Sequence, residues 1–105
     1  MLSSSTAPIF AALGDETRLH LVARLSTDGP TSITKLTAGT SVTRQAIAKH
    51  LRVMEEAGLV HSSRHGRESL YQLDQRPLED ARHYLDLVSK EWDDALGRLR
   101  DFVQG

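Results

Sequence analysis

The sequence predicts a mainly helical fold with one small β-hairpin. Three observations support this fold class. Apolar residues recur every three or four positions over most of the chain, which is helical spacing, and glycines interrupt the pattern. Two short strand-like runs flank the tripeptide His65-Gly66-Arg67. The last third of the chain keeps one unbroken heptad pattern, which is typical of a long helix.

The chain is expected to open with two helices. The run PIFAALG predicts a short helix that starts near Pro8 and stops at a glycine. Asp15 is the expected N-cap of a second helix, DETRLHLVARLS. In that helix Leu19, Val22 and Leu25 recur at helical spacing and should face the core.

Residues 31–57 predict two helices joined by a tight turn around Gly39. The first, TSITKLTAG, is capped by Thr31 or Ser32 and ended by the glycine. The second has Thr43 as its N-cap and ends before a further glycine. Two helices joined in this way form the sequence pattern of a helix-turn-helix, whose second helix enters the major groove of DNA.

The second of these helices has two contrasting faces. Its apolar stripe consists of Ile47, Leu51 and Met54. At about 100° per residue, the opposite face carries Gln45, Lys49 and Arg52, while Thr43 and Arg44 occupy the first turn. Glutamine pairs with adenine, and lysine or arginine with guanine. We therefore expect Gln45, Lys49, Thr43 and Arg44 to read bases, and Arg52 to hold phosphate.

A basic hairpin, the expected wing, follows directly over residues 59–73. Arg64, His65 and Arg67 lie near its tip, where Gly66 permits a tight turn. Residues 43–67 carry five basic and two acidic side chains in a chain of net charge −1. Such a local basic patch suits a surface that touches the DNA backbone in one place.

A long helix is expected over residues 77–102, with a heptad seam. The seam residues are Leu78, Ala81, Leu85, Val88, Trp92, Ala95, Leu99 and Phe102. Too little chain remains to cover this seam, which favours a homodimer interface, with Trp92 as its anchor, over a core within one chain.

Composition excludes several other classes. The chain has no cysteine, so disulfides and thiolate metal sites are absent, and a reducing cytoplasm is the expected location. No signal peptide or membrane span is expected, and no catalytic constellation or cofactor motif occurs. His50 is interpreted as structural. His61 and His65 are expected to meet solvent or phosphate rather than a metal ion.

Four segments together resemble the ArsR family of bacterial winged-helix repressors, and the resemblance covers nearly the whole chain. They are ALGDETRLHLVARL, VTRQAIAKHLRVMEEAGLV, SSRHGRESLYQL and the final helix with EWDDALGRL. The resemblance implies repression at inverted repeats and a homodimer joined through the first and last helices. Ile9 and Phe10 of the first helix would then join Leu85, Val88, Trp92, Ala95, Leu99 and Phe102 at the interface.

The chain departs from the metal-sensing members of that family. Where those proteins place a Cys-Val-Cys motif, this sequence has Ser32, Ile33 and Thr34, which lack soft ligands. Its last helix carries one histidine, His83, whereas the zinc and nickel sensors use several. The resemblance is therefore closer to the metal-independent members, some of which repress their own genes.

We interpret residues 1–105 as one winged helix-turn-helix domain that binds double-stranded DNA as a homodimer, most simply as a repressor. The alternative is a different kind of function, in which the winged-helix module docks a protein partner without specific DNA binding. The signal remains open: a small-molecule ligand, a protein effector, or none.

Overall fold

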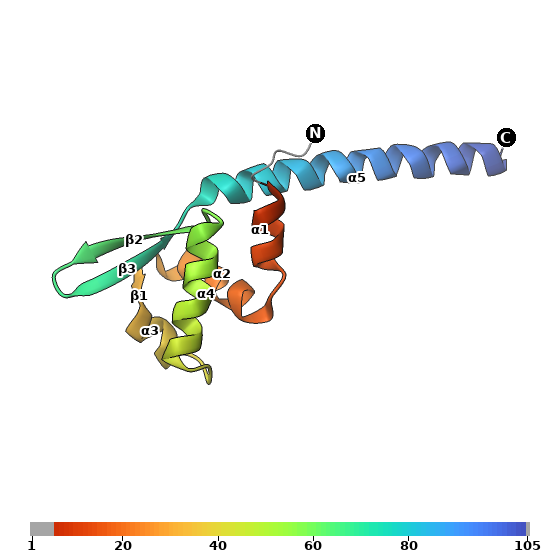
Figure 1. Ribbon diagram of the computed structural model, residues 1–105. Coiled ribbons are helices and arrows are strands. Elements are labelled where there is room, and N and C mark those ends of the chain that lie inside the picture. The colour runs from red at the N-terminus through yellow and green to blue at the C-terminus, as the bar shows by residue number, and fades with distance from the viewer. Residues whose placement is uncertain (1–5, 105) are drawn as a thin grey trace.

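The structure, a computed structural model, describes residues 6–104 of the chain. Within this range five helices and three strands follow one another (Figure 1). Their bounds are α1 Thr6–Leu13, α2 Glu16–Asp28, β1 Thr31–Ser32, α3 Ile33–Ala38, α4 Arg44–Glu56, β2 Val60–His65, β3 Glu68–Leu73 and α5 Gln75–Gln104. Helices predominate and the sheet is small, so the expected fold class is confirmed.

The helix caps explain why α2, α3 and α4 begin where they do. The Asp15 carboxylate accepts a hydrogen bond from the Arg18 backbone N–H at 3.0 Å. Ser32, and not Thr31, caps α3. The Thr43 hydroxyl accepts from the Ala46 N–H at 3.2 Å. Each cap satisfies a backbone donor that has no partner inside the helix.

The sheet has one strand more than the expected hairpin. Its strand order is β1-β3-β2, because Thr31 and Ser32 pair with Tyr71 and Leu70 before α3 begins. The N-cap residue Ser32 has extended backbone angles, φ −76° and ψ 157°, so it can act as strand and as cap. The wing is therefore a three-stranded antiparallel sheet attached to the helix-turn-helix.

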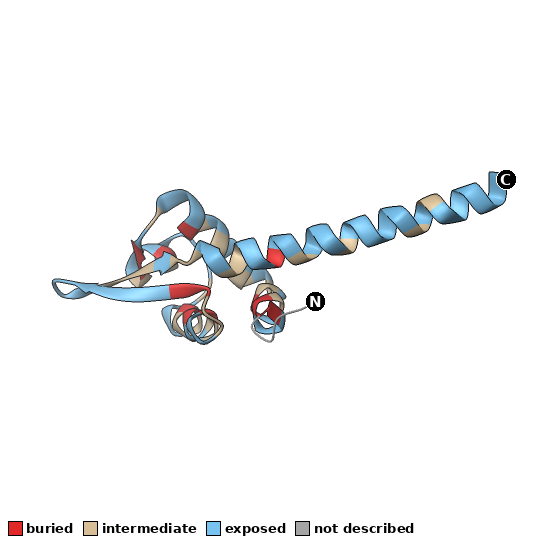
Figure 2. Cartoon of the chain, turned by 90° about the horizontal axis from the view of Figure 1, so that it is seen from above, coloured by how far each residue is buried: buried red, intermediate tan, exposed pale blue. Residues whose placement is uncertain are grey.

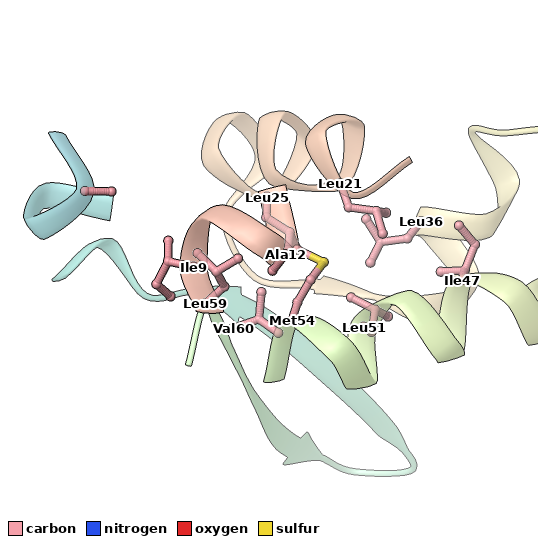
Figure 3. Packing of buried hydrophobic residues seen from close by; sticks show 11 residues of the cluster. Ile9, Ala12, Leu21, Leu25, Leu36, Ile47, Leu51, Met54, Leu59 and Val60 are labelled. Atoms are coloured by element: carbon pink, nitrogen blue, oxygen red, sulfur yellow. The ribbon is translucent and has the colours of Figure 1, made fainter. Parts of the chain in front are cut away.

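The core gathers where α2, α3, α4 and the base of the wing meet (Figure 3). Six side chains there are completely buried: Leu36, Ile47, Leu51, Met54, Leu59 and Val60. The expected stripe of α4 is thus confirmed. The stripe expected for α2 is partly wrong, since Leu19 is 48% exposed and Leu21 takes the inward position with Leu25.

Helix α5 is longer than expected by two residues at each end. Pro77 is its third residue, a position whose N–H would have no helical partner. The beginning of α5 packs on α1, where the rings of Phe10 and Tyr84 lie 5.9 Å apart. Beyond this contact α5 projects away from the other elements (Figures 1 and 2). None of the helices in residues 6–104 is long and apolar enough to span a membrane.

Candidate nucleic-acid interface

The outer face of α4 carries the row of side chains expected to meet DNA. Gln45, Lys49 and Arg52 are all exposed. The side chains on the opposite face are completely buried against α2, α3 and β2, so the row has one fixed direction. The two glutamates at the end of α4, Glu55 and Glu56, are also exposed and lie a full helix length from Thr43.

Arg44 behaves differently from this row. Its Nη1 donates a hydrogen bond to Oγ1 of Thr34 in α3 at 3.1 Å, so its guanidinium turns toward α3. Thr34 was considered in the sequence only as a residue that is not a metal ligand. The outward position of Thr34 could have been predicted from the sequence, because Ile33 and Leu36 face inward and leave Thr34 on the outer side of α3.

The expected wing residues Arg64, His65 and Arg67 are exposed at the end of the hairpin, where Gly66 has φ 65°. Arg64 and His65 pair with Ser69 and Glu68 across the two strands. Arg67 lies closer to the helix-turn-helix than Arg64 and His65 do, as its place beside Arg44 in the lining of one pocket indicates. Arg64 and His65 are not part of that pocket's lining.

His50, interpreted from the sequence as structural, contacts the side chain of Arg18. Its Nδ1 lies 3.1 Å from Nη1 of Arg18, whose Nε donates to the Ala12 carbonyl at 2.6 Å. The hydrogen bond from the Arg18 backbone N–H is the largest cause of the lowered pKa of the nearby Asp15 carboxyl. These contacts join α1, α2 and the middle of α4.

His61 is exposed to solvent, as expected, and its ring also bonds a carboxylate at the base of the wing. Nε2 of His61 lies 2.7 Å from Oδ2 of Asp74, the residue before α5. Arg76 also bonds this carboxylate through its backbone and its guanidinium. The Arg76 side chain first, and His61 second, hold the pKa of Asp74 well below its ordinary range.

The apolar stripe expected at a dimer interface is mostly uncovered. Leu85, Trp92, Leu99 and Phe102 are 53%, 63%, 59% and 85% exposed, while Val88 and Ala95 are partly exposed. Two further exposed residues, Leu96 and Val103, extend this face and were missed. Leu96 follows Trp92 by four positions, and Val103 follows Leu99 by four positions. Residues four apart share one face of a helix, but a strict heptad pattern does not include them.

The two interface residues expected in α1 are placed differently. Ile9 is 2% exposed and belongs to the core of its own chain. Phe10 is half-buried against Tyr84 of α5.

A helix-turn-helix with a basic outer face, a basic wing and a long final helix defines a winged helix-turn-helix DNA-binding protein. Comparison with known proteins agrees with this class, because the protein-family model described as a helix-turn-helix domain matches residues 13–63 of this chain. The chain is 42% identical over 78 residues to the uncharacterized HTH-type transcriptional regulator YuzN of Bacillus subtilis (strain 168), covering 69% of this chain and 85% of that protein.

Two solved structures are similar over most of their length. An ArsR-like transcriptional regulator from Rhodococcus sp. RHA1 gives a TM-score of 0.80 at 35% identity and covers 94% of this chain and 92% of its own. The homodimeric winged helix-turn-helix domain of Mb0332 from Mycobacterium bovis, a possible ArsR-family regulator, gives 0.64 at 22% identity and covers 90% and 83%. The chain belongs to the ArsR family of helix-turn-helix transcriptional regulators, which bind DNA and are not enzymes.

Proposed function

We propose that this chain is a sequence-specific repressor that binds an inverted-repeat operator as a homodimer. The observation that carries the proposal is the exposed row of Gln45, Lys49 and Arg52, held in one direction by the buried opposite face of α4. Amide and cationic side chains on a helix of this kind match the hydrogen-bonding groups at base edges in the major groove.

The side chains divide into two roles under this proposal. Gln45, Lys49 and the neighbouring Thr43 read bases, although the Thr43 hydroxyl also caps α4 as an acceptor. Phosphate is held by Arg52 on α4 and by the wing residues Arg64, His65 and Arg67. Contacts of this second kind fix register and orientation without reading sequence.

The exposed face of α5 supports dimerisation. Trp92, Leu96 and Leu99 would leave a large apolar surface in water if the chain were alone. The Mycobacterium bovis domain of the same fold is described as homodimeric. A dimer places two recognition helices about 34 Å apart, which matches half-sites one turn of DNA apart.

We propose further that DNA binding does not require a metal ion. The chain has no cysteine, and residues 6–104 contain no group of three or more side chains arranged to hold a metal. Addition of zinc, cadmium or a chelator should therefore leave the operator affinity unchanged. A metal-dependent change of tenfold or more would contradict this part of the proposal.

The rival function is docking of a protein partner through the same surface. The five basic side chains of residues 43–67 distinguish the two functions, because DNA binding through them depends steeply on salt. Fluorescence anisotropy at about 150 mM salt should compare the duplex upstream of the protein's own gene with a scrambled duplex of equal length.

A preference of about 10³-fold or more for the upstream duplex would support a sequence-specific regulator that controls its own gene. Equal weak binding to both duplexes would place the operator elsewhere. The absence of binding to both at low salt would contradict the DNA-binding proposal and favour the protein partner.

A further inference from the structure

A small polar pocket lies between α3, the first turn of α4 and the wing strand β3. Its volume is about 270 Å³, and its lining includes Thr34, Arg44, Arg67, Glu68, Ser69 and Tyr71. Since a water molecule takes about 30 Å³ of liquid, this space can hold one phosphate group with a few waters. Two guanidinium groups and four hydroxyl-bearing side chains, among them Ser32, therefore line a space of suitable size.

The charge of the pocket favours an anion. Its charged lining residues are two arginines and one glutamate, Glu68. Neither Arg44 nor Arg67 forms an ion pair within residues 6–104, so their positive charge is not neutralised there by a neighbour. The planar guanidinium group binds phosphate oxygens through two parallel hydrogen bonds.

The direction of Arg44 separates it from the residues proposed to read bases. On α4, at about 100° per residue, Arg44 lies about 100° around the helix from Gln45 and further still from Lys49. Its hydrogen bond to Thr34 fixes it on the flank of α4 that faces the wing. A side chain fixed there is poorly placed to reach a base edge beneath Gln45.

We propose that this pocket binds a single phosphate of the DNA backbone, shared by Arg44 of the recognition helix and Arg67 of the wing. The inference rests on the proposed DNA binding and replaces the role expected for Arg44 from the sequence, since Arg44 holds phosphate and does not read a base. The shared phosphate would fix the wing relative to α4 at the moment of binding. It would add affinity to every DNA sequence equally.

The test measures the salt dependence of DNA binding for Arg44→Ala, Arg67→Ala and the double variant. Neutralising one phosphate contributes about 0.9 to the slope of log affinity against log salt. Each single variant should lose up to about 0.9, and the double variant should still lose about 0.9 in total. Affinity should fall about tenfold in each single variant and by clearly less than the hundredfold product in the double.

The matched control pairs Arg44→Ala with Arg52→Ala, because Arg52 is exposed on α4 but does not line the pocket. Their slope losses should add to about 1.8. A loss of about 1.8 in the Arg44 and Arg67 double variant would mean two separate phosphates and would overturn the shared site. An unchanged slope in that double variant would overturn it as well.

A second measurement separates failure of the site from failure of DNA binding. Inorganic phosphate is titrated into the free protein at constant ionic strength, and the amide signals of Thr34 and Ser69 are followed by NMR. If the wild-type chain binds no duplex, saturable shifts that both arginine variants abolish would still support an anion site, while absent shifts would overturn it. If both arginine variants bind duplex DNA as tightly as the wild type but no longer bind inorganic phosphate, the assignment of the pocket to a DNA phosphate is wrong.

Discussion

Nε2 of His61 lies 2.7 Å from Oδ2 of Asp74, and this contact joins the start of the wing to the residue before α5. The Asp74 side chain is only 9% exposed, and its backbone N–H donates to the Leu59 carbonyl at 2.8 Å. Arg76 completes the cluster with a bond of 2.7 Å to the same carboxylate. One carboxylate thus fixes the direction of the wing relative to the proposed dimerisation helix.

Asp74→Asn should loosen this junction without unfolding the core. The asparagine side chain lacks the negative charge that Arg76 and His61 bind. Hydrogen exchange of the backbone N–H groups of Leu59 and His61 should therefore accelerate, while that of Leu51 stays slow. DNA affinity should fall because the wing is less well positioned. Hydrogen exchange measured by NMR checks the prediction, and equal acceleration at Leu51 would indicate general destabilisation instead.

The lowered pKa of Asp74 gives this contact a defined pH dependence. A carboxyl whose pKa is lowered by folding stabilises the native state above its unfolded value of about 3.9, and the stabilisation is lost as pH falls toward the folded value. The stability difference between wild type and Asp74→Asn should thus be retained at pH 5 and shrink below about pH 4. Urea denaturation across this range measures it. His61→Gln should keep the same trend, because Arg76 supplies the largest effect.

Gln45→Ala should reduce specific binding and leave random binding almost unchanged. The loss of a bidentate base contact costs about 1–3 kcal/mol on the operator, whereas phosphate contacts are retained. Anisotropy titrations with operator and scrambled duplexes measure the two affinities. A variant with full operator preference would remove Gln45 from base reading. Arg52→Ala serves as the control, with losses that are similar on both duplexes.

Much of the α4 surface could be predicted from spacing alone, because Ile47, Leu51 and Met54 leave one possible outward row. Spacing alone does not define the buried stripe of α2, since apolar residues at positions 19, 21, 22 and 25 fit two different faces. Only the packing of α2 against α1, α4 and β3 selects Leu21 over Leu19.

Contacts between distant residues could not be predicted from periodicity. The Arg44–Thr34 bond spans 10 positions and the His61–Asp74 bond spans 13, and each depends on how two elements pack. Strand β1 has two residues, which is too short for an alternating pattern to appear. The shared pocket of Arg44 and Arg67 follows from that third strand, because it draws β3 toward α3.

Trp92→Ala should weaken the proposed dimer. Trp92 is 63% exposed in the single chain, and a central aromatic residue at an interface contributes about 2 kcal/mol or more, equal to about 30-fold in the dimer dissociation constant. Sedimentation equilibrium checks the prediction. Leu87→Ala is the matched control, because Leu87 is also exposed on α5, at 41%, but lies outside the stripe. A dimer that is as tight with Trp92→Ala as with Leu87→Ala would place the interface elsewhere.

Gly39 and Arg24 should act as one unit in the turn of the helix-turn-helix. Arg24 Nη1 donates to the carbonyls of Lys35 and Leu36 at 3.1 and 3.0 Å, which satisfies the end of α3. A Cβ at position 39 would lie 2.5 Å from that same nitrogen, although φ of −89° suits any residue. Gly39→Ala therefore displaces the guanidinium, the end of a flexible side chain, and weakens its bonds to α3.

The double-mutant cycle of these two residues tests that coupling. Gly39→Ala and Arg24→Ala should each lower the free energy of unfolding by about 1 kcal/mol, and the double variant should lose little more than either alone. Urea denaturation of the four proteins measures the cycle. Thr40→Ala, in the same turn, is the control and should combine additively with Arg24→Ala, because the Thr40 hydroxyl bonds Val42 and not Arg24. Additive losses in the Gly39 and Arg24 pair would show that the glycine serves the turn for another reason.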